Sequence, residues 1–190
     1  PVSQEPAAVS PRVTLAMVGL GRMGANLVRR AMADGHHAVV YDPQPAAVEA
    51  LVSIGATGTS SLADLVAALP TPRTVWVMVP AGGITESVVG ELTGLLESGD
   101  CLIDGGNSYY RDDIRRGEVA AAKGVDYLDV GTSGGVWGLD RGYCLMIGGP
   151  DRAVDRLASL WDTIAPGFDA APRAPGREGE SVPADRGWLH

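Results

Sequence analysis

The feature that most constrains this chain is a glycine-rich turn at residues 19–24, which follows an apolar run and precedes a helical pattern. The first glycine permits a tight turn, the second lets the backbone approach a ligand, and the third allows close packing of helix on strand. The helix N-terminus then offers free N–H groups to phosphate oxygens. The turn predicts a dinucleotide-binding loop, with an ordinary strand–helix turn as the alternative. Its residues are Gly19, Leu20, Gly21, Arg22, Met23 and Gly24.

The rest of the chain continues this alternation of strand and helix patterns. Residues 75–79 are a continuous apolar run, which is typical of a parallel strand covered on both faces. Repeated βα units with right-handed crossovers predict an α/β fold with a doubly wound, mostly parallel Rossmann-type sheet. The expected strands are residues 13–18, 38–41, 75–79, 101–103, 127–130 and 143–147, and the expected helices are residues 22–34, 45–53, 60–69, 84–96, 110–123 and 151–164.

Composition divides the chain into three segments. Residues 1–11 contain three prolines and few large apolar side chains, which indicates a loose tail. Residues 12–166 carry the strand and helix patterns and form the expected cofactor-binding domain. Residues 167–190 are rich in proline, glycine and charge without an apolar period, so we expect a linker there.

Charge and composition argue against several classes of partner. The formal net charge is −8, and such a surface repels nucleic acid and anionic membranes. No apolar run is long enough to cross a bilayer, and the first residues lack the pattern of an export signal, so we expect a cytoplasmic protein. In a reducing cytoplasm Cys101 and Cys144 are expected to be buried thiols, and a disulfide between them is the alternative.

An acidic residue stands where a ribose would be bound. Asp42 ends the second expected strand, 18 positions after Gly24. A carboxylate there can accept hydrogen bonds from both hydroxyls of the adenosine ribose and repels a 2′-phosphate. The next arginine along the chain is Arg73, although Arg22 in the glycine loop is closer in space and could weaken the preference. The sequence therefore favours NAD over NADP; a turn aspartate before proline is the alternative.

Two further loops follow strands at the expected carboxyl edge of the sheet, where ligands bind in such folds. The loop after the strand at 75–79 can line the nicotinamide side or form a simple proline turn. The loop after the strand at 127–130 has small side chains and exposed N–H groups, which suit an anionic or polyhydroxylated substrate or a plain glycine turn. The candidate cofactor residues are Val79, Pro80 and Ala81, and the candidate substrate residues are Ser133, Gly134 and Gly135.

A third loop, residues 103–108, ends a strand in two glycines followed by Asn107 and Ser108. The glycines can bring the backbone close to a ligand, and the amide of Asn107 offers both a donor and an acceptor. Asn107 is therefore a candidate contact for both cofactor and substrate. The alternative is that Asn107 or Ser108 serves as the N-cap of the next helix.

Three strings in this chain resemble 6-phosphogluconate dehydrogenases, most closely their shorter, NAD-preferring bacterial branch. They are GLGRMGANL at 19–27, IDGGNSYYRD at 103–112 and DVGTSGGVWG at 129–138. The middle string is specific to this family, whereas the glycine loop is shared with the wider β-hydroxyacid dehydrogenase superfamily. The resemblance covers residues 12–190.

The resemblance implies an enzyme that oxidises the C3 hydroxyl of 6-phosphogluconate with a nicotinamide cofactor. The keto acid then loses CO₂ and gives ribulose 5-phosphate, without a metal. In such enzymes the positions matching residues 19–24, 42 and 79–81 bind cofactor. The position matching Asn107 lies between cofactor and substrate, and those matching residues 133–135 contact the phosphorylated sugar acid.

The resemblance also implies a catalytic base that these 190 residues lack. In the family the base is a lysine on an all-helical C-terminal domain, which also forms the homodimer, and neither is expected in this chain. The one lysine here, Lys123, ends a helix, and we expect it to bind the C-terminal carbonyls of that helix. His36, His37 and His190 are not expected beside Asn107. No catalytic residue is therefore assigned.

Three functions remain open from the sequence. The first is the cofactor-binding part of a 6-phosphogluconate dehydrogenase that is inactive alone. The second is another β-hydroxyacid dehydrogenase, for example of the 3-hydroxyisobutyrate type, although those relatives usually carry Ser-Thr where this chain has residues 106–108. The third is an NAD-binding module without catalysis.

Overall fold

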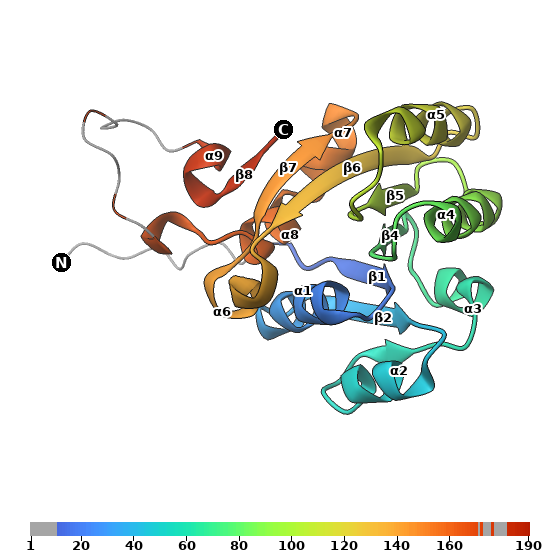
Figure 1. Ribbon diagram of the computed structural model, residues 1–190, viewed down its shortest axis with the longest axis horizontal. Coiled ribbons are helices and arrows are strands. Elements are labelled where there is room, and N and C mark those ends of the chain that lie inside the picture. The colour runs from blue at the N-terminus through green and yellow to red at the C-terminus, as the bar shows by residue number, and fades with distance from the viewer. Residues whose placement is uncertain (1–10, 171, 173–175, 177–181) are drawn as a thin grey trace.

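The computed structural model describes residues 11–170, 172, 176 and 182–190. These residues form one eight-stranded sheet with the strand order β3-β2-β1-β4-β5-β6-β7-β8 (Figure 1). Its strands are β1 (Thr14–Val18), β2 (His37–Tyr41), β3 (Thr57–Gly58), β4 (Thr74–Val77), β5 (Cys101–Asp104), β6 (Asp126–Ser133), β7 (Cys144–Gly148) and β8 (Trp188–Leu189). All neighbouring strands pair in parallel except β6 and β7, which are antiparallel. The predicted doubly wound, mostly parallel Rossmann-type fold is confirmed.

Helices cover both faces of the sheet. One apolar cluster lies between the sheet and α1, α2, α7 and α8, and a second lies between the sheet and α3, α4 and α5. The longer helices are α1 (Arg22–Ala33), α2 (Pro45–Val52), α3 (Leu62–Ala67), α4 (Gly83–Leu95), α5 (Tyr110–Ala121), α7 (Asp151–Arg156) and α8 (Ala158–Ile164). Every residue of β4 is buried, as predicted for a parallel strand that is covered on both faces of the sheet.

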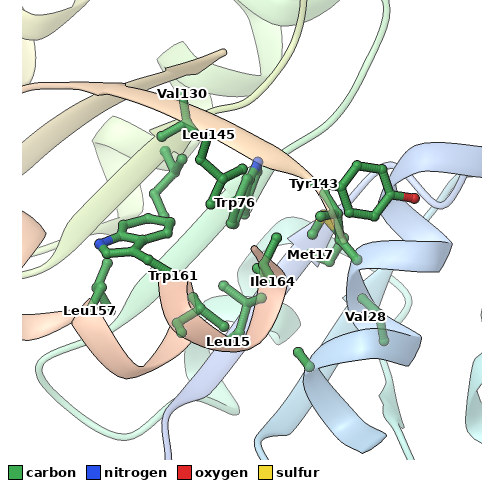
Figure 2. Packing of buried hydrophobic residues seen from close by; sticks show 14 of the residues in the cluster. Leu15, Met17, Val28, Trp76, Val130, Tyr143, Leu145, Leu157, Trp161 and Ile164 are labelled. Atoms are coloured by element: carbon green, nitrogen blue, oxygen red, sulfur yellow. The ribbon is translucent and has the colours of Figure 1, made fainter. Parts of the chain in front are cut away.

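Trp76 of β4 and Trp161 of α8 form the centre of the larger cluster (Figure 2). Their ring centroids lie 5.7 Å apart at an interplanar angle of 68°, an edge-to-face arrangement that aromatic pairs favour. The indole nitrogen of Trp161 donates to the carbonyl of Val154, so this side chain also ties α7 to α8. Burial of both rings joins the middle of the sheet to the last helices.

Several boundaries differ from the sequence prediction. The expected helix at 151–164 is divided at Leu157 into α7 and α8. A 3₁₀ turn, η1 (Gly135–Trp137), and the short α6 (Gly138–Arg141) connect β6 to β7. Cys101 is buried as expected, but Cys144 is exposed, and both are free thiols. Cys144 is exposed because the described helices cover the other face of β7, where Leu145 and Ile147 are buried.

The segment predicted as a linker holds regular structure where it is described. It contains the 3₁₀ turn η2 (Phe168–Ala170), α9 (Pro183–Arg186) and β8, which extends the sheet beside β7. The indole nitrogen of Trp188 donates to Asp162 on α8 at 2.8 Å, which fixes β8 to the domain. The predicted tail lies outside the described residues except for Pro11, whose carbonyl accepts a hydrogen bond from Ser159. Among the described residues, no helix has the length and apolar character needed to cross a membrane.

Candidate functional site

The strand order reverses at β1, which lies between β2 and β4, and a cleft opens at the carboxyl ends of these strands. Such a reversal is the general ligand position in open α/β sheets. The cleft consists of a cavity of about 680 Å³ next to β2 and a cavity of about 630 Å³ next to β5 and β6. The two cavities share the wall residues Gly21, Met78, Val79 and Pro80.

Glycine stands at positions 19, 21 and 24 of the loop for different structural reasons. Gly19 has φ +91°, and a Cβ there would lie 2.4 Å from the carbonyl oxygen of Met78. A Cβ on Gly24 would lie 2.0 Å from the carbonyl oxygen of Gly19, so helix and turn touch through backbone atoms. A Cβ on Gly21 would meet no heavy atom within 4 Å. The chain itself therefore requires glycine at 19 and 24, whereas the open space at Gly21 fits a bound phosphate group.

The start of α1 is free to bind an anion. Its N-cap is Gly21, which makes no side-chain capping bond, and no acidic residue lies in its first turn. The first N–H groups of a helix lack intrahelical acceptors and favour negative charge. Arg22 is exposed, and among the described residues that line the second cavity it is the one with a charged side chain. Of the predicted loop residues, Leu20 lines the first cavity and Met23 the second.

Asp42 follows β2 and lines the first cavity. Its Oδ2 accepts the backbone N–H of Leu20 at 2.8 Å, and its Oδ1 accepts the N–H of Gln44 at 2.8 Å. Asp42 is thus also a turn aspartate, which was the alternative, because its bond to the backbone of Gln44 closes a turn. The bond to Leu20 additionally fixes the glycine loop against the end of β2. Contact between Asp42 and a ribose stays a prediction.

The β2 end of the cleft is acidic. Glu91 lines the first cavity together with Asp42, and a neighbouring cavity of about 700 Å³ is lined by Asp42, Glu49 and Asp64. No arginine or lysine is among the residues that line either cavity in the described part of the chain. A negative field at this end disfavours an additional phosphate group.

The loop after β5 is held by one buried carboxylate. Asp104 is 1% exposed; its Oδ1 accepts the N–H of Gly106 at 2.9 Å, and its Oδ2 accepts the hydroxyl of Ser108 at 2.7 Å. Asn107, between these two residues, lines the second cavity with Val79, Pro80 and Ala81. The structure thus brings these four predicted residues together.

One alternative for this loop is ruled out, and Gly105 has a packing reason of its own. Helix α5 has Tyr109 as its N-cap and no side-chain capping bond, so neither Asn107 nor Ser108 caps it. A Cβ on Gly105 would lie 2.0 Å from Nε1 of Trp76, so this glycine is required by packing against the core. Close approach to a ligand is not needed to explain it.

The loop after β6 reaches the cleft earlier than the sequence indicated. Gly131 and Thr132 belong to the loop that the sequence predicted to suit a substrate, although they were not among its named candidates, and both line the second cavity. Ser133, Gly134 and Gly135 are not among its lining residues and lie where β6 turns into η1. The signal for Thr132 was its position two residues after the end of the strand expected at 127–130, at the carboxyl edge of the sheet. The assignment of residues 133–135 to substrate stays a prediction.

Lys123 lies away from this cleft. Its Nζ donates to the carbonyl of Thr93 at 3.1 Å, in the last turns of α4, and not to its own helix as predicted. Because α4 starts at the cleft and runs away from it, Thr93 is near the opposite edge of the sheet. His36 is buried, its Nδ1 accepts the N–H of Val13, and burial lowers its pKa. The described residues contain no group of His, Cys, Asp and Glu side chains suited to a metal ion.

A glycine loop at the reversal of strand order, a free helix N-terminus and an acid after β2 are the features of a dinucleotide-binding domain. Residues 14–170 match the model of the family described as the NAD binding domain of 6-phosphogluconate dehydrogenase. The chain belongs to this family.

Two comparisons with known proteins support this assignment, and a third shows the same fold. The NAD(+)-dependent, decarboxylating 6-phosphogluconate dehydrogenase of Haloferax volcanii is 41% identical over 155 residues, which are 82% of this chain and 51% of that protein. The structure of Plasmodium falciparum 6-phosphogluconate dehydrogenase matches with a TM-score of 0.77 at 27% identity, over 84% of this chain and 35% of that one. Mycobacterium tuberculosis 3-hydroxyisobutyrate dehydrogenase shares the fold, with a TM-score of 0.74 at 24% identity, over 81% and 52%. The chain spans about half the length of the first curated relatives it matches.

Proposed function

We propose that this chain is the cofactor-binding half of an NAD-dependent, decarboxylating 6-phosphogluconate dehydrogenase. The observation that carries the proposal is the division of charge along the cleft. Asp42 and Glu91 make the β2 end negative, whereas Arg22 and the free start of α1 make the other end positive. The negative end suits an adenosine ribose without a 2′-phosphate, which favours NAD. The positive part suits the pyrophosphate and an acidic substrate.

The second cavity supports a polyhydroxylated, anionic substrate. Asn107 offers an amide donor and acceptor, Thr132 offers a hydroxyl group, and Arg22 supplies positive charge. A bound nicotinamide ring would accept a hydride from the carbinol carbon of the substrate. The proposed substrate is a phosphorylated sugar acid, 6-phosphogluconate, and Ser133, Gly134 and Gly135 complete its site in this proposal.

The general base of the reaction is proposed to come from outside these 190 residues. A base must lie within hydrogen-bond reach of the hydroxyl that it deprotonates. Lys123 is instead engaged with Thr93 at the far edge of the sheet. The chain is therefore expected to bind NAD without oxidising 6-phosphogluconate by itself.

Calorimetric titration of the chain with NAD and NADP tests the cofactor proposal. We expect NAD to bind at least about tenfold more tightly, which corresponds to about 1.4 kcal/mol. Tighter binding of NADP would contradict the proposal that the acidic β2 end of the cleft disfavours a 2′-phosphate. A second titration, with NAD present, compares 6-phosphogluconate with 3-hydroxyisobutyrate; preference for the latter would favour the other β-hydroxyacid dehydrogenases. NADH formation from 6-phosphogluconate by the chain alone would overturn the assignment of the base.

A further inference from the structure

A buried ionic cluster beside the cleft has no part in the function proposed above. Its centre is Arg116 on α5, which is 4% exposed. The Nε of Arg116 donates to Oε2 of Glu86 at 3.0 Å, and its Nη1 donates to Oδ2 of Asp104 at 3.3 Å. Glu86 belongs to the first turn of α4, and Asp104 ends β5. One guanidinium group therefore joins two elements that each lead into the cleft.

The Asp104 side of this cluster controls the loop that carries Asn107. Asp104 binds Gly106 and Ser108, the two neighbours of Asn107, and Nη1 of Arg116 also lies 3.4 Å from the hydroxyl oxygen of Ser108. The position of the Asn107 backbone is thus set from both sides by the same carboxylate, and Arg116 holds that carboxylate in place.

The Glu86 side of the cluster controls the opposite wall. Thr85, next to Glu86, is fully buried, and its hydroxyl donates to the carbonyl of Pro80 at 2.9 Å. The first turn of α4 is therefore bonded both to the Pro80 wall and to Arg116. The two walls touch between these anchors, since a Cβ on Gly106 would lie 3.2 Å from the carbonyl oxygen of Val79.

Arg116 has two further buried neighbours, and burying these charged groups costs free energy unless their hydrogen bonds are kept. Nη1 also lies 3.4 Å from Oδ1 of Asp113, and the hydroxyl of Tyr127 donates to the same oxygen at 2.9 Å. Two buried carboxylates thus share one buried cation. Buried ion pairs contribute little net stability compared with apolar packing, whereas they fix geometry through directional bonds.

We propose that Arg116 is a positioning residue that holds Asn107 at a fixed distance from the Pro80 wall, so that the nicotinamide end of the cofactor fits between them. The inference rests on the proposed function, in which NAD occupies the cleft. It concerns one end of the cofactor only, because the described contacts of Arg116 do not reach the glycine loop or Asp42.

The substitution Arg116→Lys separates positioning from charge. Lysine keeps the positive charge that the buried carboxylates need, but its ammonium group cannot reproduce the planar fork that binds Glu86 and Asp104 together. The affinities for NAD and for ADP-ribose, which lacks the nicotinamide, are measured by calorimetry. We expect the Kd for NAD to rise about tenfold and that for ADP-ribose to change less than about twofold, because only NAD fills the space between the walls.

Arg115→Lys is the matched control. Arg115 also binds Glu86, with both terminal nitrogens, but its side chain is 52% exposed and touches neither Asp104 nor Ser108. Its replacement should leave both affinities unchanged. Glu86→Gln is the second test variant, because the Glu86 side chain is 47% exposed and its loss leaves no buried charge without a partner. It should selectively weaken NAD in the same direction, and it decides the question if Arg116→Lys does not fold.

The outcomes separate the inference from the proposed function. If the unchanged chain binds neither ligand, the proposed function fails and the inference fails with it. If the unchanged chain binds NAD no more tightly than ADP-ribose, or if the variants weaken both ligands equally, the positioning role is overturned while cofactor binding stands. A selective loss of NAD affinity in Arg116→Lys or Glu86→Gln, but not in Arg115→Lys, supports it.

Discussion

The carboxylate of Asp42, which follows β2, accepts the backbone N–H of Leu20, which follows the neighbouring strand β1, at 2.8 Å. The residue proposed to bind the ribose therefore also holds the loop proposed to bind the pyrophosphate. These two roles require different properties of the side chain. An oxygen acceptor is sufficient to hold Leu20, whereas discrimination against a 2′-phosphate requires negative charge.

The substitution Asp42→Asn should separate the two roles. Asparagine keeps one oxygen acceptor, which can hold Leu20 although the bond to Gln44 is then lost, and it removes the charge. The glycine loop should therefore keep its place while the repulsion of a 2′-phosphate is lost. We expect the preference for NAD over NADP to shrink by roughly 1–3 kcal/mol, the range for a lost interaction with a charged group. Asp42→Ala removes the acceptor as well and should weaken both cofactors. Calorimetric titration of each variant with NAD and NADP measures both effects.

Glu91→Gln is the matched control for this prediction. Glu91 lines the same cavity but accepts none of the hydrogen bonds that fix the glycine loop. If Glu91→Gln closes the gap between NAD and NADP as much as Asp42→Asn does, the preference comes from the general negative field of this end and not from Asp42.

Two glycines of the loop should respond oppositely to alanine. Gly21 has φ −59° and open space around its missing Cβ, so Gly21→Ala should fold with nearly unchanged thermal stability but lose most of its affinity for NAD. Gly24→Ala places a methyl group 2.0 Å from the carbonyl oxygen of Gly19 and should destabilise the chain by roughly 1–3 kcal/mol, the usual cost of overpacking. Thermal unfolding and calorimetry compare the two. Full NAD binding by Gly21→Ala would contradict the placement of the pyrophosphate.

The parts of this fold that local sequence patterns encode were predictable. The continuous apolar run at 75–79 predicted a central strand, and β4 is buried throughout. The glycine turn and Asp42 were predicted to bind parts of one dinucleotide, and the Leu20–Asp42 bond shows that they lie side by side. The antiparallel direction of β7 and the pairing of β8 were not predictable, because strand direction depends on distant partners that leave no periodic signal.

The cluster around Arg116 was missed for a different reason. Asp113, Arg116 and Ala120 are all buried on one face of α5, although charged side chains on a helix normally face solvent. Their spacing by three and four residues was visible in the sequence. Its meaning depended on Asp104 and Tyr127, which reach this face from two neighbouring strands.

The two cysteines should differ in reactivity. Burial raises the pKa of the Cys101 thiol to about 12, so almost no thiolate forms near neutral pH. Cys144 is exposed and should react readily. Titration with a chromogenic disulfide at pH 8 should detect about one thiol in the folded chain and two in denaturant. Cys144→Ser should abolish the reaction of the folded chain, and Cys101→Ser should leave it unchanged; rapid modification of both thiols would contradict the burial of Cys101.

The free energy of unfolding should depend on pH through the ionisation of the buried carboxyl of Asp113. Burial raises its pKa from 3.8 to about 6, helped by the nearby charges of Asp104 and Asp129 and opposed by the hydrogen bond from Tyr127. The folded chain therefore binds this proton more tightly than the unfolded chain, and stability falls as pH rises from about 4 through about 6. Asn at 113 mimics the protonated carboxyl, so Asp113→Asn should remove this fall.

Urea unfolding of Asp113→Asn and the unchanged chain at several pH values measures the difference in the free energy of unfolding. That difference should shift in favour of the variant between pH 4 and about 6.5 and stay constant below this window. Glu86→Gln is the control with the opposite sign, because hydrogen bonds from Arg115 and Arg116 lower the pKa of Glu86 from 4.5 to about 2. Its stabilising contribution is present above pH 4.5 and is lost as pH falls toward 2. Parallel stability curves for Asp113→Asn and the unchanged chain between pH 4 and 6.5 would show that Asp113 titrates as an ordinary surface carboxyl.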